Sequence, residues 1–238
     1  MDWIILITIV FLATSLQTST GFGFSILGTP FLFLIYPAQE AIQINIVLSL
    51  FISMIMIYKV RHDINKTLVK RLIIGSTVGI TPGLFIYLTF DVETFKIFIG
   101  ILILILTVLL IFKLTIKRSR IKDFFTGGIS GALTTSIGVP GPPLLLYFAG
   151  VNTDKSTLRS TTLAYYLFIY LISLIMQIIF AGTNKIVFTS SLIAIPSLLG
   201  GILFGQLLFK WINQEAFRII TYVILLITGS YMVISSFL

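Results

Sequence analysis

Cysteine is absent from this sequence of 238 residues, and histidine occurs once, at His62. Disulfides, thiolate metal sites and sites built from several histidines are therefore excluded. Charge is also scarce: aspartate, glutamate, lysine and arginine make up 10% of the residues, whereas a soluble domain carries about 25%. With 57% apolar residues, the composition predicts an all-α protein that crosses the lipid bilayer several times.

The acidic residues lie at or near the ends of the apolar segments. They are Asp2, Glu40, Asp63, Asp91, Glu93, Asp123, Asp154 and Glu215. A carboxylate proton relay in the middle of the membrane is therefore not expected. An enzyme would need a nucleophile with a base, or a metal cluster, and the sequence offers neither, so it does not indicate an enzyme. We expect no metal and no other cofactor.

The basic residues outnumber the acidic ones and give a net charge of +8. They lie in short connections between apolar segments, where the rules of membrane topology place them. This pattern does not predict a nucleic-acid partner. A P-loop of glycines and lysine is absent too, so no nucleotide partner is expected.

Eight apolar segments divide the chain, four in residues 1–116 and four in residues 117–238. The first segment, 3–36, is too long for one crossing of about 20 residues and too short for two crossings with a turn. It predicts a re-entrant hairpin of two half-helices or, alternatively, one long helix unwound at Gly21–Gly23. The other segments are 41–58, 68–90, 94–114, 124–150, 156–181, 186–209 and 214–236.

The two halves resemble one another in three places that occur in the same order. Residues 91–97 (DVETFKI) match residues 213–219 (NQEAFRI), and the pair Gly79 and Gly83 matches the pair Gly201 and Gly205 at the same offset of 122. Pro30 matches Pro143 at an offset of 113. These matches indicate duplication of a unit of about 115 residues, so 1–116 and 117–238 are predicted to be two membrane repeats of one transporter domain. For the two glycine pairs we favour a role in helix packing.

Two motifs interrupt the apolar sequence in the same way, one near the start of each half. Each begins with a cluster of hydroxyl residues and passes through glycines to a proline, at residues 18–30 and 134–143. Irregular backbone at membrane depth must line a cavity or be buried in protein. Paired interruptions of this kind in corresponding halves indicate the substrate site of a transporter.

The chemistry of the two motifs suits a small anion that must lose its hydration shell. Backbone N–H groups at half-helix N-termini stabilise negative charge, glycine lets the backbone approach a ligand, and proline is tolerated in a first helical turn. Serine and threonine hydroxyls can donate to oxyanion oxygens. The predicted substrate-binding residues of the motifs are Thr18, Ser19, Thr20, Gly21, Gly23, Ser25 and Pro30, and Thr134, Thr135, Ser136, Gly138, Gly141 and Pro143.

Two further polar residues complete the predicted site. Arg159 follows the second motif, and its guanidinium is expected to reach back toward an anion at Ser136–Gly141; the alternative is an arginine that extends to the membrane surface. Asn45 lies within an apolar segment, where it contacts substrate or makes an interhelical hydrogen bond. The same two alternatives apply to Gln177, and the pair Tyr165 and Tyr166 is expected to line the path or to pack.

The distribution of positive charge favours one topology. If each first segment is a hairpin, the two halves are inverted, and the connections 59–71, 113–123, 150–159 and 210–218 share one side. That side then holds 14 of the 16 lysines and arginines. If each first segment crosses once, the halves are parallel and the split is 11 to 5. The positive-inside rule prefers the more uneven split, so we expect inverted repeats with both termini outside.

With these motifs, the chain resembles the sulfite exporter TauE/SafE family, also called the four-toluene sulfonate uptake family. The resemblance rests on Gly21, Gly23, Gly28 and Pro30, on Gly138, Gly141 and Pro143, on 41–45 with its counterpart 156–160, and on the two glycine pairs. The sequence departs from the family pattern at Phe22, Phe24 and Ser25, and has Pro140 and Pro142 where a small residue is common.

The resemblance implies a multi-pass protein of the cell (inner or plasma) membrane that transports a small organic or inorganic anion. Sulfite, sulfonates and related carboxylates are the implied substrates. We expect a secondary transporter that works by alternating access, and the resemblance implies that it exports its substrate. The alternatives are an anion channel and a non-catalytic membrane subunit of a larger complex. The sequence is also compatible with a homodimer.

Overall fold

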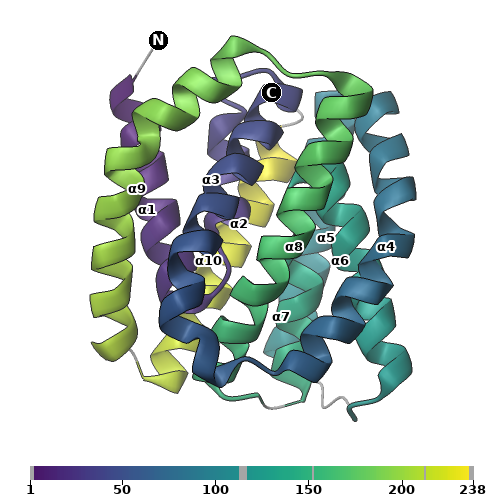
Figure 1. Ribbon diagram of the computed structural model, residues 1–238, viewed down its shortest axis with the longest axis vertical. Helices are drawn as coiled ribbons and strands as arrows, with labels where there is room; N and C mark the ends of the chain where they lie inside the picture. The colour runs from purple at the N-terminus through teal and green to yellow at the C-terminus, as the bar shows by residue number, and fades with distance from the viewer. Residues whose placement is uncertain (1–2, 113–116, 152, 212, 236–238) are drawn as a thin grey trace.

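The computed structural model describes residues 3–112, 117–151, 153–211 and 213–235, and in these ranges it contains helices and no strand (Figure 1). Within these ranges all eight apolar segments are largely helical, and the first segment of each half consists of two helices. The boundary expected between 116 and 117 touches 113–116, which lie outside the described residues. The helices are α1 (Trp3–Thr20), α2 (Phe24–Leu32), α3 (Ala38–Val60), η1 (Arg61–Asp63), α4 (Lys66–Thr89), α5 (Val92–Ile111), α6 (Arg120–Ile137), α7 (Gly141–Gly150), α8 (Lys155–Ala181), α9 (Lys185–Trp211) and α10 (Gln214–Ser235).

Five of these helices are long and apolar enough to cross a membrane: α1, α3 with η1, α4, α8 and α9. The half-helices α2 and α7 are much shorter, with 9 and 10 residues. Helices of this length cannot span a hydrocarbon core of about 30 Å. Each must therefore end inside the protein at one of its termini.

The first segment is a helical hairpin that turns at Gly21–Gly23. Gly21 and Gly23 have φ of 88° and 120°, values that only glycine adopts easily. Beyond the turn, α2 folds back along α1, because a Cβ placed on Gly28 would lie 3.7 Å from the Cβ of Ala13. The alternative of one long, locally unwound helix is thereby wrong.

The second segment is also a hairpin, and it turns at 138–140. Gly138 is left-handed, with φ of 72°, and its N–H donates to Thr134 O at 2.8 Å, which ends α6 in the way glycine usually ends a helix. Two prolines then occupy the first turn of α7, where their missing N–H groups cost nothing. The hydroxyl of Tyr147 in α7 donates to the buried carboxylate of Asp123 at the start of α6, so α7 folds back along α6.

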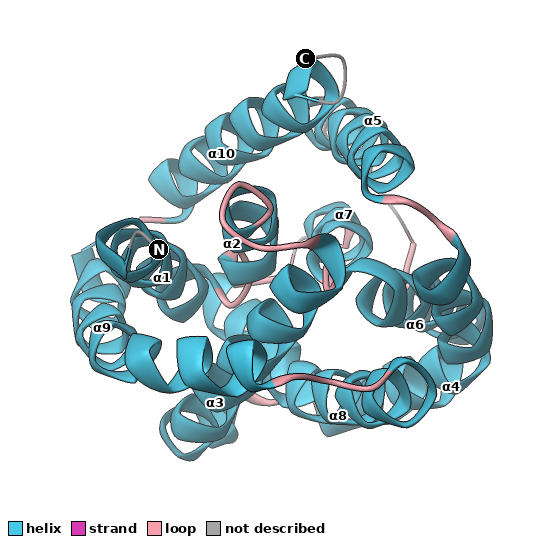
Figure 2. Cartoon of the chain, turned by 90° about the horizontal axis from the view of Figure 1, so that it is seen from above, coloured by secondary structure: helices cyan, strands magenta, loops and turns pink. Residues whose placement is uncertain are grey.

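Close helix pairs join the two halves. Gly79 and Gly83 of α4 contact the backbone of α6, and Gly201 and Gly205 of α9 contact α1. A Cβ on Gly201 would lie 2.8 Å from Phe11 O, so a larger residue does not fit there. The packing role predicted for both glycine pairs is confirmed. Viewed from above, α2 and α7 lie inside the bundle, between α5 and α10 on one side and α3 and α8 on the other (Figure 2).

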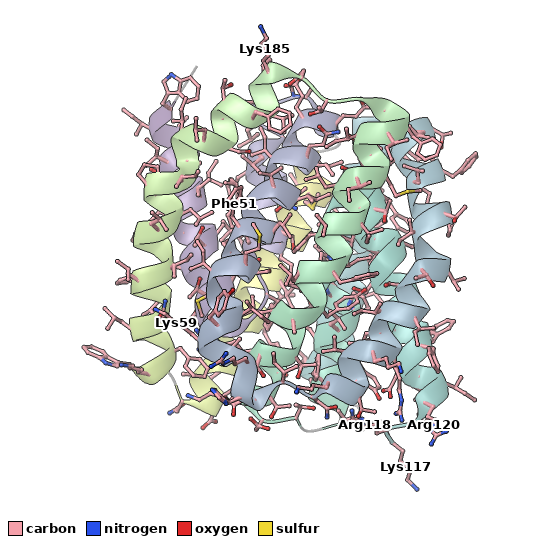
Figure 3. The ribbon with its side chains drawn as sticks, viewed as in Figure 1. Phe51, Lys59, Lys117, Arg118, Arg120 and Lys185 are labelled. Atoms are coloured by element: carbon pink, nitrogen blue, oxygen red, sulfur yellow. The ribbon has the colours of Figure 1, made fainter. Side chains whose placement is uncertain are left out.

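The two ends of the bundle differ in charge. Lys117, Arg118 and Arg120 lie at one end and Lys185 at the other (Figure 3). Contacts place the four basic connections together, because Ser156 donates to Asp63, Arg71 pairs with Asp123, and Lys155 donates to Phe209 O. We call this the basic end. Since α1 runs parallel to α9 and α6 runs parallel to α4, the first half begins at the Lys185 end and the second half at the basic end.

Candidate functional site

The tips of the two hairpins meet inside the bundle. A Cβ placed on Gly141, the first residue of α7, would lie 3.6 Å from the Cβ of Phe22 and 3.3 Å from Cδ1 of Ile26. Phe22 is part of the first break, and Ile26 lies in the first turn of α2. The structure therefore brings together the two motifs that the sequence singled out, and the N-termini of both half-helices open into the same region.

Each tip rests on a helix of the opposite half. Gly21 packs on Arg159 of α8 so closely that a Cβ on Gly21 would lie 2.5 Å from the Arg159 Cα. Gly138 packs in the same way on Asn45 of α3, whose Nδ2 donates to Gly138 O at 2.8 Å. Asn45 and Arg159 thus hold equivalent places, one below each tip, and the interhelical hydrogen bond expected of Asn45 is present.

Arg159 lies at the first motif, whereas the sequence associated it with Ser136–Gly141. The reason is that the turn glycine of each hairpin packs on a helix of the opposite half, although both hairpins also contact the helix that follows them. The side chain is buried, with 7% of its surface exposed. Its Cζ lies 4.1 Å from the centroid of the Phe209 ring, a cation–π contact.

The positive charge of Arg159 is not neutralised by a carboxylate in the described part of the chain. The ion pair found there joins Arg71 to Asp123 at 2.8 Å. Nε of Arg159 is buried and has no hydrogen-bond partner among the described atoms. A buried guanidinium with an unused donor and no counter-charge is costly unless a ligand supplies the missing partner.

Most of the hydroxyls predicted to bind substrate form hydrogen bonds within the hairpins. Side chains in both motifs donate to carbonyls one turn back in their own helix: Ser19 and Thr20 to Leu16 O, Thr134 to Ser130 O, Thr135 to Gly131 O and Ser136 to Ala132 O. Thr20 also contacts Phe22 O and accepts from Phe22 N, which closes the first turn. Thr18 packs against Gly205 of α9. Among these hydroxyls, those of Thr18 and Ser25 are buried and without a described partner.

The remaining glycines and prolines of the prediction shape the tips. Gly23 is the N-cap of α2, and Gly141 begins α7. Pro143 lies in the first turn of α7, as expected for a residue that begins a half-helix. Both prolines were expected to begin or to kink the second half-helix, and Pro30 lies inside α2, one turn and a half beyond its first residue, so it does not begin it. The two prolines therefore occupy different places in the two half-helices.

A group of buried polar side chains near the tips lacks hydrogen-bond partners among the described residues. The Tyr166 hydroxyl lies 3.1 Å from the Cβ position of Gly141, and the rings of Tyr166 and Tyr170 pack edge to face with centroids 5.1 Å apart. The Tyr170 hydroxyl lies near Ser25 and Ser49. Atoms without partners occur in Gln17, Ser25, Thr29, Asn45, Ser49, Arg159, Thr162, Tyr166 and Tyr170. Buried polar groups are nearly always bonded, so this group is suited to a polar ligand.

The sequence reasoning missed Gln17, Ser49 and Tyr170. Gln17 and Ser49 carried a readable signal, because each is a polar residue inside an otherwise apolar segment. Tyr170 carried none, since a tyrosine in a membrane helix is usual. Gln177 makes the interhelical hydrogen bond that was one of its two expected roles, because its Nε2 donates to Thr135 O at 2.8 Å, while its Oε1 has no described partner.

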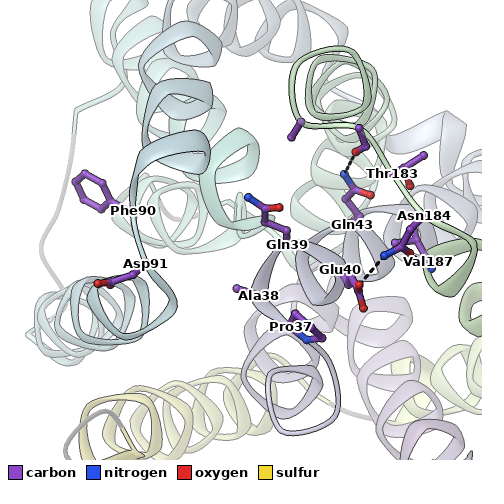
Figure 4. Close-up of a pocket in the computed structure, with 12 residues that line it drawn as sticks. Pro37, Ala38, Gln39, Glu40, Gln43, Phe90, Asp91, Thr183, Asn184 and Val187 are labelled. Carbon is purple, nitrogen blue, oxygen red and sulfur yellow. Dashed lines mark hydrogen bonds between the residues drawn. The ribbon is translucent and has the colours of Figure 1, made fainter.

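A polar pocket of about 500 Å³ opens at the Lys185 end, between the start of α3 and the ends of α4 and α8 (Figure 4). Gln43 lies beside it and donates to Gly182 O at 2.9 Å and to the Tyr87 hydroxyl at 3.3 Å. Its lining includes two acids, Glu40 and Asp91, and no basic residue. Hydrogen bonds from Thr94 hold the pKa of Asp91 below its usual range, so this carboxylate is charged at neutral pH. From Gln43, α3 leads inward to Asn45 and the second tip.

A family model described as "Sulfite exporter TauE/SafE" matches residues 6–232, which is nearly the whole chain. No curated protein and no solved structure matches this chain.

Proposed function

Because this chain belongs to the sulfite exporter TauE/SafE family, we propose that it is a secondary transporter of a small organic or inorganic anion, sulfur-containing such as sulfite or a sulfonate. The family places it among membrane transporters. The observation that carries the proposal is the convergence of both half-helix N-termini beside Arg159, a buried cation without a carboxylate partner.

This arrangement provides what an oxyanion loses when it leaves water. The guanidinium of Arg159 presents a fork of donors that matches oxyanion geometry. The first turn of α2 adds N–H groups that have no partner inside the helix, and the Ser25 hydroxyl adds another donor. Together these groups bind a single negative charge in a region where a dehydrated anion would otherwise be unstable.

We further propose that residues 1–116 and 117–238 are inverted repeats, and that transport proceeds by alternating access. The contacts support this proposal: α4 packs on α6 as α9 packs on α1, while α3 pairs with α8 and α5 with α10. Asn45 and Arg159 are equivalent in this relation. By the positive-inside rule the basic end is cytoplasmic, in the cell membrane.

Transport in liposomes tests the proposal. Purified protein would be reconstituted and the uptake of radiolabelled sulfite measured over a range of concentrations. We expect saturable uptake, and we expect Arg159→Gln to reduce the rate at low substrate by at least about tenfold, which corresponds to about 1.4 kcal/mol.

Arg120→Gln is the matched control, because Arg120 is exposed at the basic end. It should leave the rate nearly unchanged. Uptake that rises without saturating would identify a channel. No uptake of sulfite or of any sulfonate by the folded protein would refute the proposed substrate class.

A further inference from the structure

Unpartnered polar atoms are distributed unevenly between the two hairpins. In α1 and α2, buried side-chain atoms of five residues have no described hydrogen-bond partner: Thr14, Gln17, Thr18, Ser25 and Thr29. In α6 and α7, no described side chain has such an atom. The second hairpin is thus internally satisfied, whereas the first holds polar groups that need partners from elsewhere.

Gln17 is the most marked case. Its side chain is 0% exposed, and both its Nε2 and its Oε1 lack partners among the described atoms. It lies on the same face of α1 as Ala13, which packs on Gly28 of α2. Thr14 and Thr18 are different, because they lie on the face that contacts the glycines of α9. Gln17 is therefore directed to the interior, one turn before Gly21.

The backbone shows the same asymmetry. The first turn of α2, Phe24–Ile26, offers N–H groups that have no partner within the helix. The first turn of α7 contains Pro142 and Pro143, which have no N–H. Backbone donors therefore come mainly from the first hairpin, the same hairpin that carries Gln17 and contacts Arg159.

We propose that Gln17 contacts the substrate and determines its specificity. This inference rests on the proposed function of the same site. Nε2 of Gln17 donates to an oxyanion oxygen, and Oε1 accepts from an O–H or N–H on the same ligand. Arg159 supplies one buried positive charge and no carboxylate in the described part of the chain opposes it, an arrangement that suits a monoanion. The substrate class is a monoanion that carries a hydrogen-bond donor beside its oxyanion group.

Two sulfonates that differ in one hydroxyl provide the probe: 2-hydroxyethanesulfonate and ethanesulfonate. A site that bonds a ligand hydroxyl rejects the analogue that lacks it, because its own polar groups are then left unpaired. We expect the wild type to bind 2-hydroxyethanesulfonate at least about tenfold more tightly, and Gln17→Met to bind both equally. Affinity would be measured from the ligand-induced rise in Tm of the purified protein.

The unliganded protein gives a second readout. Removing an amide that lacks partners should leave Tm unchanged or raise it, whereas removing a bonded amide should lower it. Gln43→Met is the matched control, because the Gln43 amide is also buried but bonded to Gly182 O and Tyr87. We expect Tm to fall in Gln43→Met and not in Gln17→Met.

Either of two results would overturn the inference: a fall in Tm in unliganded Gln17→Met as large as in Gln43→Met, or retained preference for the hydroxylated sulfonate in Gln17→Met. If neither sulfonate raises the Tm of the wild type, the ligand class proposed here is wrong. Saturable sulfite uptake would then show whether the transport function itself survives.

Discussion

At the residue scale, two glycines decide where the chain can turn and what the turns can touch. Gly21 has a positive φ and directly contacts the Arg159 backbone. Gly138 also has a positive φ and contacts Asn45. Glycine is required twice over at such a position, once for its φ and once for the missing Cβ. The motif glycines therefore bring Arg159 and Asn45 within reach of the two half-helices.

We expect Gly21→Ala to destabilise the protein strongly. The substitution adds the strain of a left-handed residue, about 1–2 kcal/mol, and also forces the new Cβ into the Arg159 backbone. Gly182→Ala is the control, because Gly182 has a similar φ of 78° with nothing within 4 Å of its Cβ position. Thermal unfolding should show a clearly larger fall in Tm for Gly21→Ala. Equal falls would mean that the contact with Arg159 contributes nothing.

Two tyrosines, one in α7 and one just beyond α2, hydrogen-bond to partners of different charge. Tyr147 of α7 donates to the carboxylate of Asp123, which is 0% exposed and paired with Arg71, while Tyr36, just beyond α2, donates to the neutral Ser190 hydroxyl at 2.9 Å. Hydrogen bonds to charged groups contribute about 1.5–3 kcal/mol and neutral ones about 0.5–1.5 kcal/mol. Tyr147→Phe should therefore lower the free energy of unfolding more than Tyr36→Phe does, as measured by chemical denaturation. The reverse order would show that the Asp123 carboxylate adds nothing to the bond.

At the element scale, the sequence predicted the helices well because their boundaries depend on local features. The eight segments, both breaks and the packing glycines follow from hydropathy, Gly and Pro. The residues that the two breaks contact do not follow from these local features, because they come from the opposite half of the chain. The position of Arg159 at the first motif depends on how whole hairpins pack, and no spacing within residues 134–159 reveals it. Gln17 was readable as a polar residue inside an apolar segment, but the lack of hydrogen-bond partners that sets it apart is visible only in three dimensions.

The helix that carries Arg159, α8, begins at an aspartate whose side chain caps its N-terminus. Asp154 is the N-cap of α8, and its side chain accepts from the Thr157 N–H at 2.9 Å. Partial burial pushes the pKa of Asp154 upward, but hydrogen bonds from Thr157 and Ser156 outweigh it, so the pKa lies below its ordinary value. A carboxylate whose pKa is lowered by folding stabilises the native state above about pH 4, and this contribution is lost as the pH falls through the folded pKa.

We therefore expect Asp154→Ala to destabilise the protein by about 1 kcal/mol at neutral pH. The deficit relative to the wild type should shrink on acidification below about pH 4. Asp154→Asn retains a good cap and should behave much like the wild type at neutral pH. Thermal unfolding across the pH range provides the measurement. A deficit of Asp154→Ala that persists undiminished in acid would show that the charge of Asp154 is irrelevant.

At the scale of the whole molecule, the charge asymmetry of the two ends gives a direct test of orientation. The chain has no cysteine, so a thiol reagent will label only a cysteine that is introduced by mutation. We expect Arg118→Cys to react with a membrane-impermeant thiol reagent only from the cytoplasmic side, and Lys185→Cys only from outside. Both positions lie in described parts of the chain, at opposite ends of the bundle. Labelling of both from the same side would exclude the inverted arrangement in a membrane.

Arg159 contacts the aromatic ring of Phe209 and forms no ion pair with a carboxylate in the described residues. This has a consequence for the charge that transport would move across the membrane. Arg159 is fixed in α8, so under the proposed function a monoanion that crosses without a coupled ion would move one negative charge across the bilayer in each turnover. A membrane potential of about 100 mV, negative inside, then contributes about 2.3 kcal/mol to outward movement. Under the proposed function, the resting potential of a cell would therefore favour export of such an anion without a coupled ion gradient.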